Sequence, residues 1–233
     1  LRWAGLKSVR FKKMLEIAGL GAAPAVFQGF GLVNNLITNN SLMIYGNNEM
    51  GAGGGDLAIS ALSVVNTVES IALMVVLGMN NAISTIISYN YGAKQYERVR
   101  KAIRFTAAIG FLYMLVVWLA VIIFPKEILS VFTTDKTMIS LGEHALKLYF
   151  FGFFFMSFQF VGQSTFTALG CAKRAVFFSI FRKVIIVVPL TIVLPMLGLG
   201  VEGVFIAEPI SNAIGGLASF TTMYFTLYKK LPE

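Results

Sequence analysis

Two glutamates lie inside long stretches that are otherwise free of charge. Glu69 is the only charged residue between Asp56 and Lys94, and Glu208 has none between itself and Lys229. If these stretches cross a membrane, a charge at their depth costs about 2.5–3.5 kcal/mol on the lenient insertion scale. Such a carboxyl group stays protonated, pairs with a base, or faces water. It can then exchange H⁺ or hold Na⁺, although a shallow carboxylate could also serve packing alone.

Carboxamides and hydroxyls accompany these glutamates at helical spacing. Gln159, Gln163 and Thr167 recur every four residues, and Glu208 and Asn212 share one helical face. Polar faces on otherwise apolar helices indicate a bundle around something polar. Small polar residues can instead hold membrane helices together, at about 0.6 kcal/mol per hydrogen bond. The candidate cleft residues are Gln28, Asn34, Asn35, Asn39, Asn66, Glu69, Gln159, Gln163, Glu208 and Asn212.

Motifs for covalent or metal chemistry are missing from the sequence. There is no HExxH or GxSxG pattern, and His144 and Cys171 are the only residues of their types. Residues 198–203 match GxGxxG but have no strand–helix–strand context, so we reject a nucleotide site there. We therefore predict that the chain is not an enzyme, with no metal site and no cofactor except a coupling ion, H⁺ or Na⁺.

Composition predicts a membrane protein. The chain is 57% hydrophobic and 13% charged, whereas soluble domains are about a quarter charged. A bilayer core of roughly 30 Å needs about 20 apolar residues per helix, and charge-free windows supply them. We expect six transmembrane helices, at residues 17–45, 57–91, 102–124, 145–169, 175–197 and 202–228. The aromatic run at 149–160 could face lipid or bind cations, and lipid is favoured.

Basic residues mark one side of this predicted bundle. Nearly all Lys and Arg residues fall in four clusters at alternate junctions between spans: residues 2–13, 94–104, 173–183 and 229–230. This asymmetry predicts that both termini are cytoplasmic. It assigns the net charge of +8 to acidic lipid headgroups rather than to nucleic acid. Arg182 and Lys183 lie near the basic end of a span, so snorkelling would explain them.

Three blocks of sequence resemble the multidrug and toxic compound extrusion (MATE) family. The first is Gly78-Met79 with Ile87–Lys94 and Arg98-Val99, the second is Thr165–Lys173, and the third is Gly200–Val204 leading to Glu208–Ser211. Arg182–Val184, Val188–Leu190 and Leu194-Pro195 lie between the last two. Their order resembles the second half of such a transporter, over about Gly19 to Tyr228.

The resemblance implies an all-α membrane protein, one six-helix lobe of a twelve-helix transporter. Residues 1–16 would be the linker between lobes, 17–228 the C-terminal lobe, and 229–233 a cytoplasmic tail. The implied function is efflux of drug-like organic cations in exchange for H⁺ or Na⁺ across the bacterial plasma membrane. The implied partners are substrate, membrane lipid and an N-terminal lobe. Many members carry acidic residues in the first and fourth spans of this half, where this chain has Asn and Gln, so coupling could rest on the other lobe.

Three alternatives remain at this point. A lipid-linked oligosaccharide flippase of related fold would need a basic cleft for pyrophosphate. An intramembrane enzyme would need a nucleophile with a base, or a set of metal ligands. A six-span protein acting alone as a homodimer would have no second homologous half.

Overall fold

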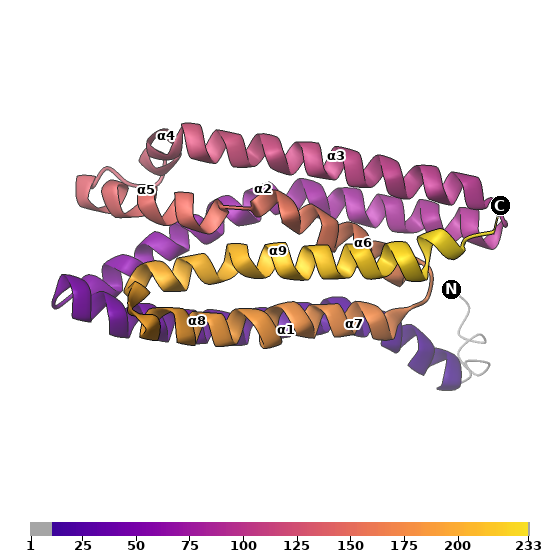
Figure 1. Cartoon of the computed structure of the whole chain (residues 1–233), viewed down its shortest axis with the longest axis horizontal. Helices are drawn as coiled ribbons and strands as arrows, with labels where there is room; N and C mark the ends of the chain where they lie inside the picture. Colours follow the sequence, from indigo (N-terminus) through magenta and orange to yellow (C-terminus); the bar gives the residue numbers. More distant parts are fainter. Residues whose placement is uncertain (1–10, 233) are drawn as a thin grey trace, which may run out of the picture.

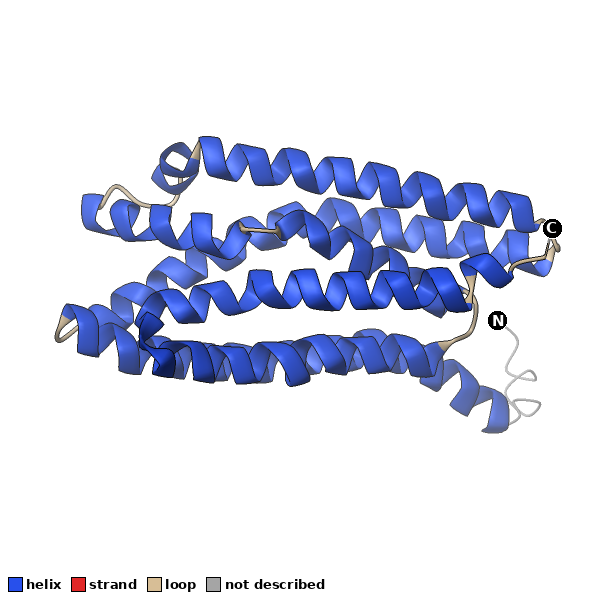
Figure 2. Cartoon of the chain, viewed as in Figure 1, coloured by secondary structure: helices blue, strands red, loops and turns tan. Residues whose placement is uncertain are grey.

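The computed structural model describes residues 11–232, except the side chains of residues 11–13 and 15–28. This part of the chain is helical with short connections and contains no strand (Figure 2). The helices are α1 (Phe11–Met50), α2 (Gly54–Gly92), α3 (Tyr96–Ile123), α4 (Pro125–Ser130), α5 (Lys136–Phe150), α6 (Met156–Ala168), α7 (Ala172–Ile180), α8 (Val188–Leu194) and α9 (Gly200–Thr226). Most of the predicted linker, residues 1–10, lies outside the described residues.

The long helices run side by side as one bundle (Figure 1). Four helical stretches in the described part are long and apolar enough to cross a membrane: 54–92, 96–123, 136–168 and 172–230. The last of these folds back near Gly198, where φ is +96°, so α7–α8 and α9 form two passes. With α1, whose 40 residues extend about 60 Å, the bundle has the six passes predicted from the sequence.

Two of the passes are irregular: the fourth has a break that the sequence did not predict, and the fifth is distorted around prolines, which are expected to bend a helix. The fourth breaks between α5 and α6 at Phe151 and Gly152, and Gly152 has a left-handed φ of +79°. In the fifth, wide π-helical turns at Phe181–Val187 and Pro195–Leu199 flank α8. Proline cannot donate the usual backbone hydrogen bond, so Pro189 and Pro195 favour such distortions. By contrast, α9 continues through Pro209.

Two apolar clusters occupy opposite ends of the bundle. One contains Leu42, Val65, Phe150 and Phe205, and the other contains Ile87, Val99, Phe166 and Met223. The aromatic run at 149–160 is divided: Tyr149, Phe150, Phe153 and Phe160 are buried, Phe151 is exposed, and Phe154, Phe155 and Phe158 are half-buried. Our expectation of lipid-facing rings is therefore wrong for the four buried rings.

Helices α1 and α2 approach closely where small residues meet. A Cβ atom on Gly55 would lie 2.7 Å from the carbonyl oxygen of Met43, and one on Gly46 would lie 2.8 Å from that of Gly54. We therefore expect Gly55→Ala to lower the free energy of unfolding by about 1–3 kcal/mol through overpacking. Thermal unfolding in detergent would measure this loss. Gly78→Ala is the control, since a Cβ on Gly78 meets nothing within 4 Å; equal effects would contradict the described contact.

Candidate functional site

A groove lined by both polar and apolar side chains lies between α2, α6 and α7. Its volume is about 480 Å³, within the range of roughly 300–1,000 Å³ typical of small-molecule sites. The polar residues that line it are Ser70, Asn80, Asn81, Ser84, Gln163, Ser164, Thr167 and Ser179. The apolar part includes Met74 and Phe160. None of the lining residues is charged, so the groove offers amide and hydroxyl groups beside an aromatic ring.

Hydrogen bonds between neighbouring helices hold some of these groups in place. The side-chain amide of Gln163 on α6 donates to the hydroxyl of buried Ser179 on α7 at 2.8 Å. Ser164 bonds the Phe160 carbonyl at 2.8 Å and reaches Asn80 on α2 only at 3.5 Å. Beyond the groove, Ser88 on α2 donates to the Ala168 carbonyl at 2.9 Å. The orientation of the Gln163 side chain is therefore fixed by a hydrogen bond. The side chain of Asn81 is exposed and could contact a ligand in the groove.

An ion-pair network is buried between the π-helical turn at 181–187 and α9. Arg182 is fully buried; its Nη2 is paired with Oε1 of Glu208, and its Nε donates to Ser211 at 3.2 Å. The ammonium of Lys183 contacts the same Glu208 oxygen at 3.0 Å. The Arg182 side chain fits here because residue 215 is a glycine. A Cβ atom on Gly215 would lie 3.1 Å from both Cβ and Cγ of Arg182.

This network corrects the expectation that Arg182 and Lys183 snorkel. A buried charge without a partner is very costly, whereas one with a close counter-charge and further hydrogen bonds is tolerated. Glu208 supplies the counter-charge one helix away, so Arg182 points inward instead of towards water. The pairing also neutralises the charge of Glu208. The other carboxyl group deep in the described bundle, that of Glu69, is bonded to a neutral tyrosine instead.

Glu69 lies on α2 within electrostatic range of this network. Its Oε2 accepts a hydrogen bond of 2.8 Å from the hydroxyl of Tyr149, and its interactions extend to Glu208, Lys183 and Arg182. Tyr149 and Glu208 line a small cavity together with Asn34, Asn35, Thr38 and Asn66. The cavity measures about 20 Å³, which is enough for about one water molecule.

The ten candidate residues fall into separate places. Asn34, Asn35, Asn66 and Glu208 line the small cavity, with Glu69 bonded to its Tyr149, and Gln163 lines the groove.

Three of the remaining candidates line neither space. Gln159 and Asn212 are buried, with no hydrogen-bond partner among the described residues. Asn39 is exposed on α1, and the side chain of Gln28 lies outside the described part.

Several residues of these two spaces were missed from the sequence. Asn80 and Asn81 are an amide pair inside an apolar helix, and the criterion applied to Asn34 and Asn35 would have found them. Tyr149 and Arg182 gave no such signal, because their roles depend on partners 80 and 26 residues away. Among the described residues, no group of three or more His, Cys, Asp or Glu side chains could hold a metal ion.

Comparison with known proteins identifies a transporter family. The MatE family model matches residues 32–193. The "Probable multidrug resistance protein YoeA" of Bacillus subtilis is 24% identical over 177 residues, which are 76% of this chain and 38% of that protein. The "FAD transporter" of Shewanella oneidensis is 20% identical, over 70% of this chain and 36% of that protein.

Solved structures match over nearly the whole chain. An outward-facing MATE family transporter of the MOP superfamily superposes with a TM-score of 0.84 at 19% identity, over 96% of this chain and 49% of that one. An inward-facing transporter of the same description gives a TM-score of 0.75, over 97% of this chain and 51% of that one. At such identities the likeness shows the fold, and the chain spans about half the length of these structures.

Proposed function

Because the chain belongs to the MatE family, we propose that it forms the C-terminal six-helix lobe of a twelve-helix multidrug exporter. The chain is a multi-pass membrane protein of a transporter family. Together with an N-terminal lobe it would enclose a cleft that opens alternately to each side of the plasma membrane, by rocking of one lobe against the other. Residues 1–16 would connect the lobes, and both ends of this chain would be cytoplasmic.

One observation carries this proposal: an uncharged groove, lined by amide, hydroxyl and apolar side chains, lies in the same bundle as a buried charge network. The carbonyl oxygens of Asn80, Asn81 and Gln163 and the ring of Phe160 are suitable partners for an organic cation. The nearby carboxylate of Glu69 is suited to H⁺ or Na⁺. A drug exporter driven by an ion gradient needs both kinds of site. Transport of this kind is conformational and needs no covalent chemistry.

The two glutamates have different roles in this proposal. Glu208 is held by two cationic partners, Arg182 and Lys183, so it serves to fix α9 against the fifth pass. Glu69 has a neutral hydrogen-bond donor, Tyr149, and lies close to the small polar cavity. We therefore assign ion coupling in this lobe to Glu69, with H⁺ or Na⁺ as its ion.

The flippase alternative is not favoured. It needs cationic side chains in the cleft to hold pyrophosphate, but Arg182 is buried against Glu208 and the groove lining is uncharged. FAD also carries a pyrophosphate, so a groove without cationic side chains does not suit FAD either. The substrate class that suits the groove is a drug-like molecule that is neutral or carries one positive charge.

Ethidium efflux from cells carrying the full-length protein tests the groove. We expect Gln163→Leu to slow efflux by about twofold to tenfold, because it removes one neutral hydrogen bond from the lining. The control is Gln95→Leu, an exposed residue before α3 whose side chain makes no cap hydrogen bond. Equal efflux from both variants at equal expression would remove the groove from the transport path.

A further inference from the structure

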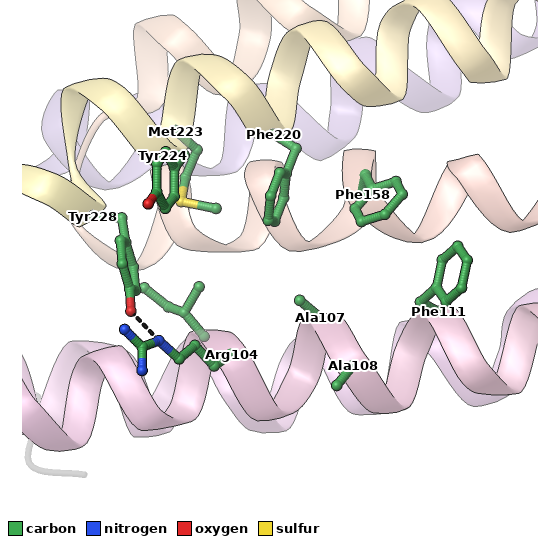
Figure 3. A pocket seen from close by; sticks show the side chains of 10 residues that line it. Arg104, Ala107, Ala108, Phe111, Phe158, Phe220, Met223, Tyr224 and Tyr228 are labelled. Carbon is green, nitrogen blue, oxygen red and sulfur yellow. Dashed lines mark hydrogen bonds between the residues drawn. The ribbon is translucent and has the colours of Figure 1, made fainter.

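A second groove lies on the other side of α6, between α3, α6 and α9 (Figure 3). Its volume is about 430 Å³, and most of its lining is aromatic or aliphatic. Phe111 comes from α3, Phe158 from α6, and Phe220 and Tyr224 from α9. It shares no lining residue with the groove between α2, α6 and α7, so it has no part in the proposed drug site.

This groove is apolar at one end and cationic at the other. Phe111 and Phe158 lie at one end in Figure 3, Arg104 and Tyr228 lie at the other, and Phe220 lies between them. Along the groove, Arg104 to Phe111 on α3 extend about 10–12 Å, and so do Phe220 on α9 to Tyr228, which lies in the short 3-10 turn just after α9. The groove is therefore elongated along the helix axes, which in a membrane protein means across the bilayer.

Its polar end lies where the helices reach the membrane surface. Arg104 is the last charged residue of α3 before the charge-free stretch 105–125, and Lys229 is the first after the apolar stretch of α9. Basic residues at such positions mark the depth of the lipid headgroups. This end of the bundle is the one predicted to face the cytoplasm, where anionic lipids attract basic segments.

The charges at this end suit an anion. The Nε of Arg104 donates to the hydroxyl of Tyr228, and its two terminal nitrogens have no partner among the described residues. The ammonium of Lys229 lies 5.5 Å from the centre of the Tyr224 ring and 4.7 Å from that of Phe225. Because the hydroxyl oxygen of Tyr228 accepts the hydrogen bond from Arg104, the hydroxyl proton of Tyr228 can be donated to a bound anion. The neighbouring Lys101 is paired with Glu97 at 2.7 Å and adds little.

We propose that this groove binds an anionic phospholipid, with one acyl chain along the aromatic surface and the phosphate at Arg104 and Tyr228. The direction of the groove matches a lipid of the leaflet that it faces: apolar towards the bilayer centre, cationic at the surface. A drug-like cation would be repelled by Arg104 and Lys229. A soluble anion would leave the apolar length empty. The site rests on the membrane-spanning fold alone and not on the transport proposal.

Native mass spectrometry of the full-length protein tests the site by counting retained dioleoyl phosphatidylglycerol against dioleoyl phosphatidylcholine, which has the same chains and a neutral headgroup. The wild type should retain phosphatidylglycerol preferentially. Arg104→Gln should reduce that retention by at least about fivefold, the effect of about one cationic residue at a membrane surface. Arg98→Gln is the control, because it removes the same charge from an exposed position of α3 outside the groove. Ala107→Phe should block the apolar length and reduce retention of both lipids.

Three results would overturn the site. Equal retention of the two lipids by the wild type would exclude recognition of the headgroup, and this result needs no variant. Equal loss in Arg104→Gln and Arg98→Gln would show only general attraction to a basic surface. Loss of ethidium binding rather than lipid binding in Ala107→Phe would make the groove a drug site.

Discussion

Glu208→Ala should be the most destabilising single substitution in the buried charge network, with a loss of about 3–5 kcal/mol in the free energy of unfolding. The substitution leaves the guanidinium of Arg182 in the interior, where the Ser211 hydroxyl is its one remaining hydrogen-bond partner among the described residues. Lys183 loses the same acceptor. A cation that is buried without its counter-charge accounts for the large effect, which denaturant titration in detergent would measure.

A double variant distinguishes the effect of losing the counter-charge from the effect of losing the packing of the side chain. Arg182→Met with Glu208→Leu removes both members of the pair, and we expect it to recover most of the stability, because the cost lies in the unpaired ion. Glu202→Ala on the same helix is the matched control. Its carboxylate is about half exposed and pairs with His144, so its loss should stay within about 1 kcal/mol. Equal losses in Glu208→Ala and Glu202→Ala would contradict a buried network.

Glu69→Gln should abolish gradient-driven efflux while leaving drug binding intact. The amide keeps the size of the side chain and its contact with Tyr149 but cannot take up H⁺ or bind Na⁺ as a carboxylate does. We expect ethidium efflux to fall to the level of cells lacking the protein, with an unchanged dissociation constant for ethidium measured on the purified variant. Tyr149→Phe should give a smaller loss, about tenfold, since it removes one hydrogen bond to a charged group.

The exposed carboxylate of Glu97 on α3, which is bonded to Lys101, provides the control for this charge change. Glu97→Gln should transport as the wild type does. The assignment would be reversed if Glu208→Gln lost coupling in a stably folded protein while Glu69→Gln kept it. If both variants kept efflux, the coupling residues would lie outside this lobe and both glutamates would have structural roles only.

The sequence predicted the bundle because its signals are local. Charge-free windows long enough to cross a bilayer, with basic clusters at alternate junctions, predicted six passes whose starts and ends lie up to nine residues from those of the described helices. The main local failure is the break at Gly152, which falls inside a continuous apolar run and so left no change in composition.

The site was predicted less well because its roles depend on contacts between helices. Glu69 and Glu208 stand out in the sequence as charges in apolar surroundings, but their partners, Tyr149 and Arg182, come from other passes. Arg182 was expected to reach water because it lies near a helix end in the sequence. The π-helical turn and the space beside Gly215 direct it inward instead. Periodicity could not supply that information.

In the proposed exporter, an ion gradient drives drug movement through the cleft that this lobe helps to form. The most direct test is the full-length protein in proteoliposomes, with ethidium movement followed under an imposed H⁺ gradient and, separately, an imposed Na⁺ gradient. We predict that one of the two ions drives ethidium in the direction opposite to its own flow, and that reversing the gradient reverses the movement. Ethidium that moves at the same rate with either gradient, or with none, would contradict the claim.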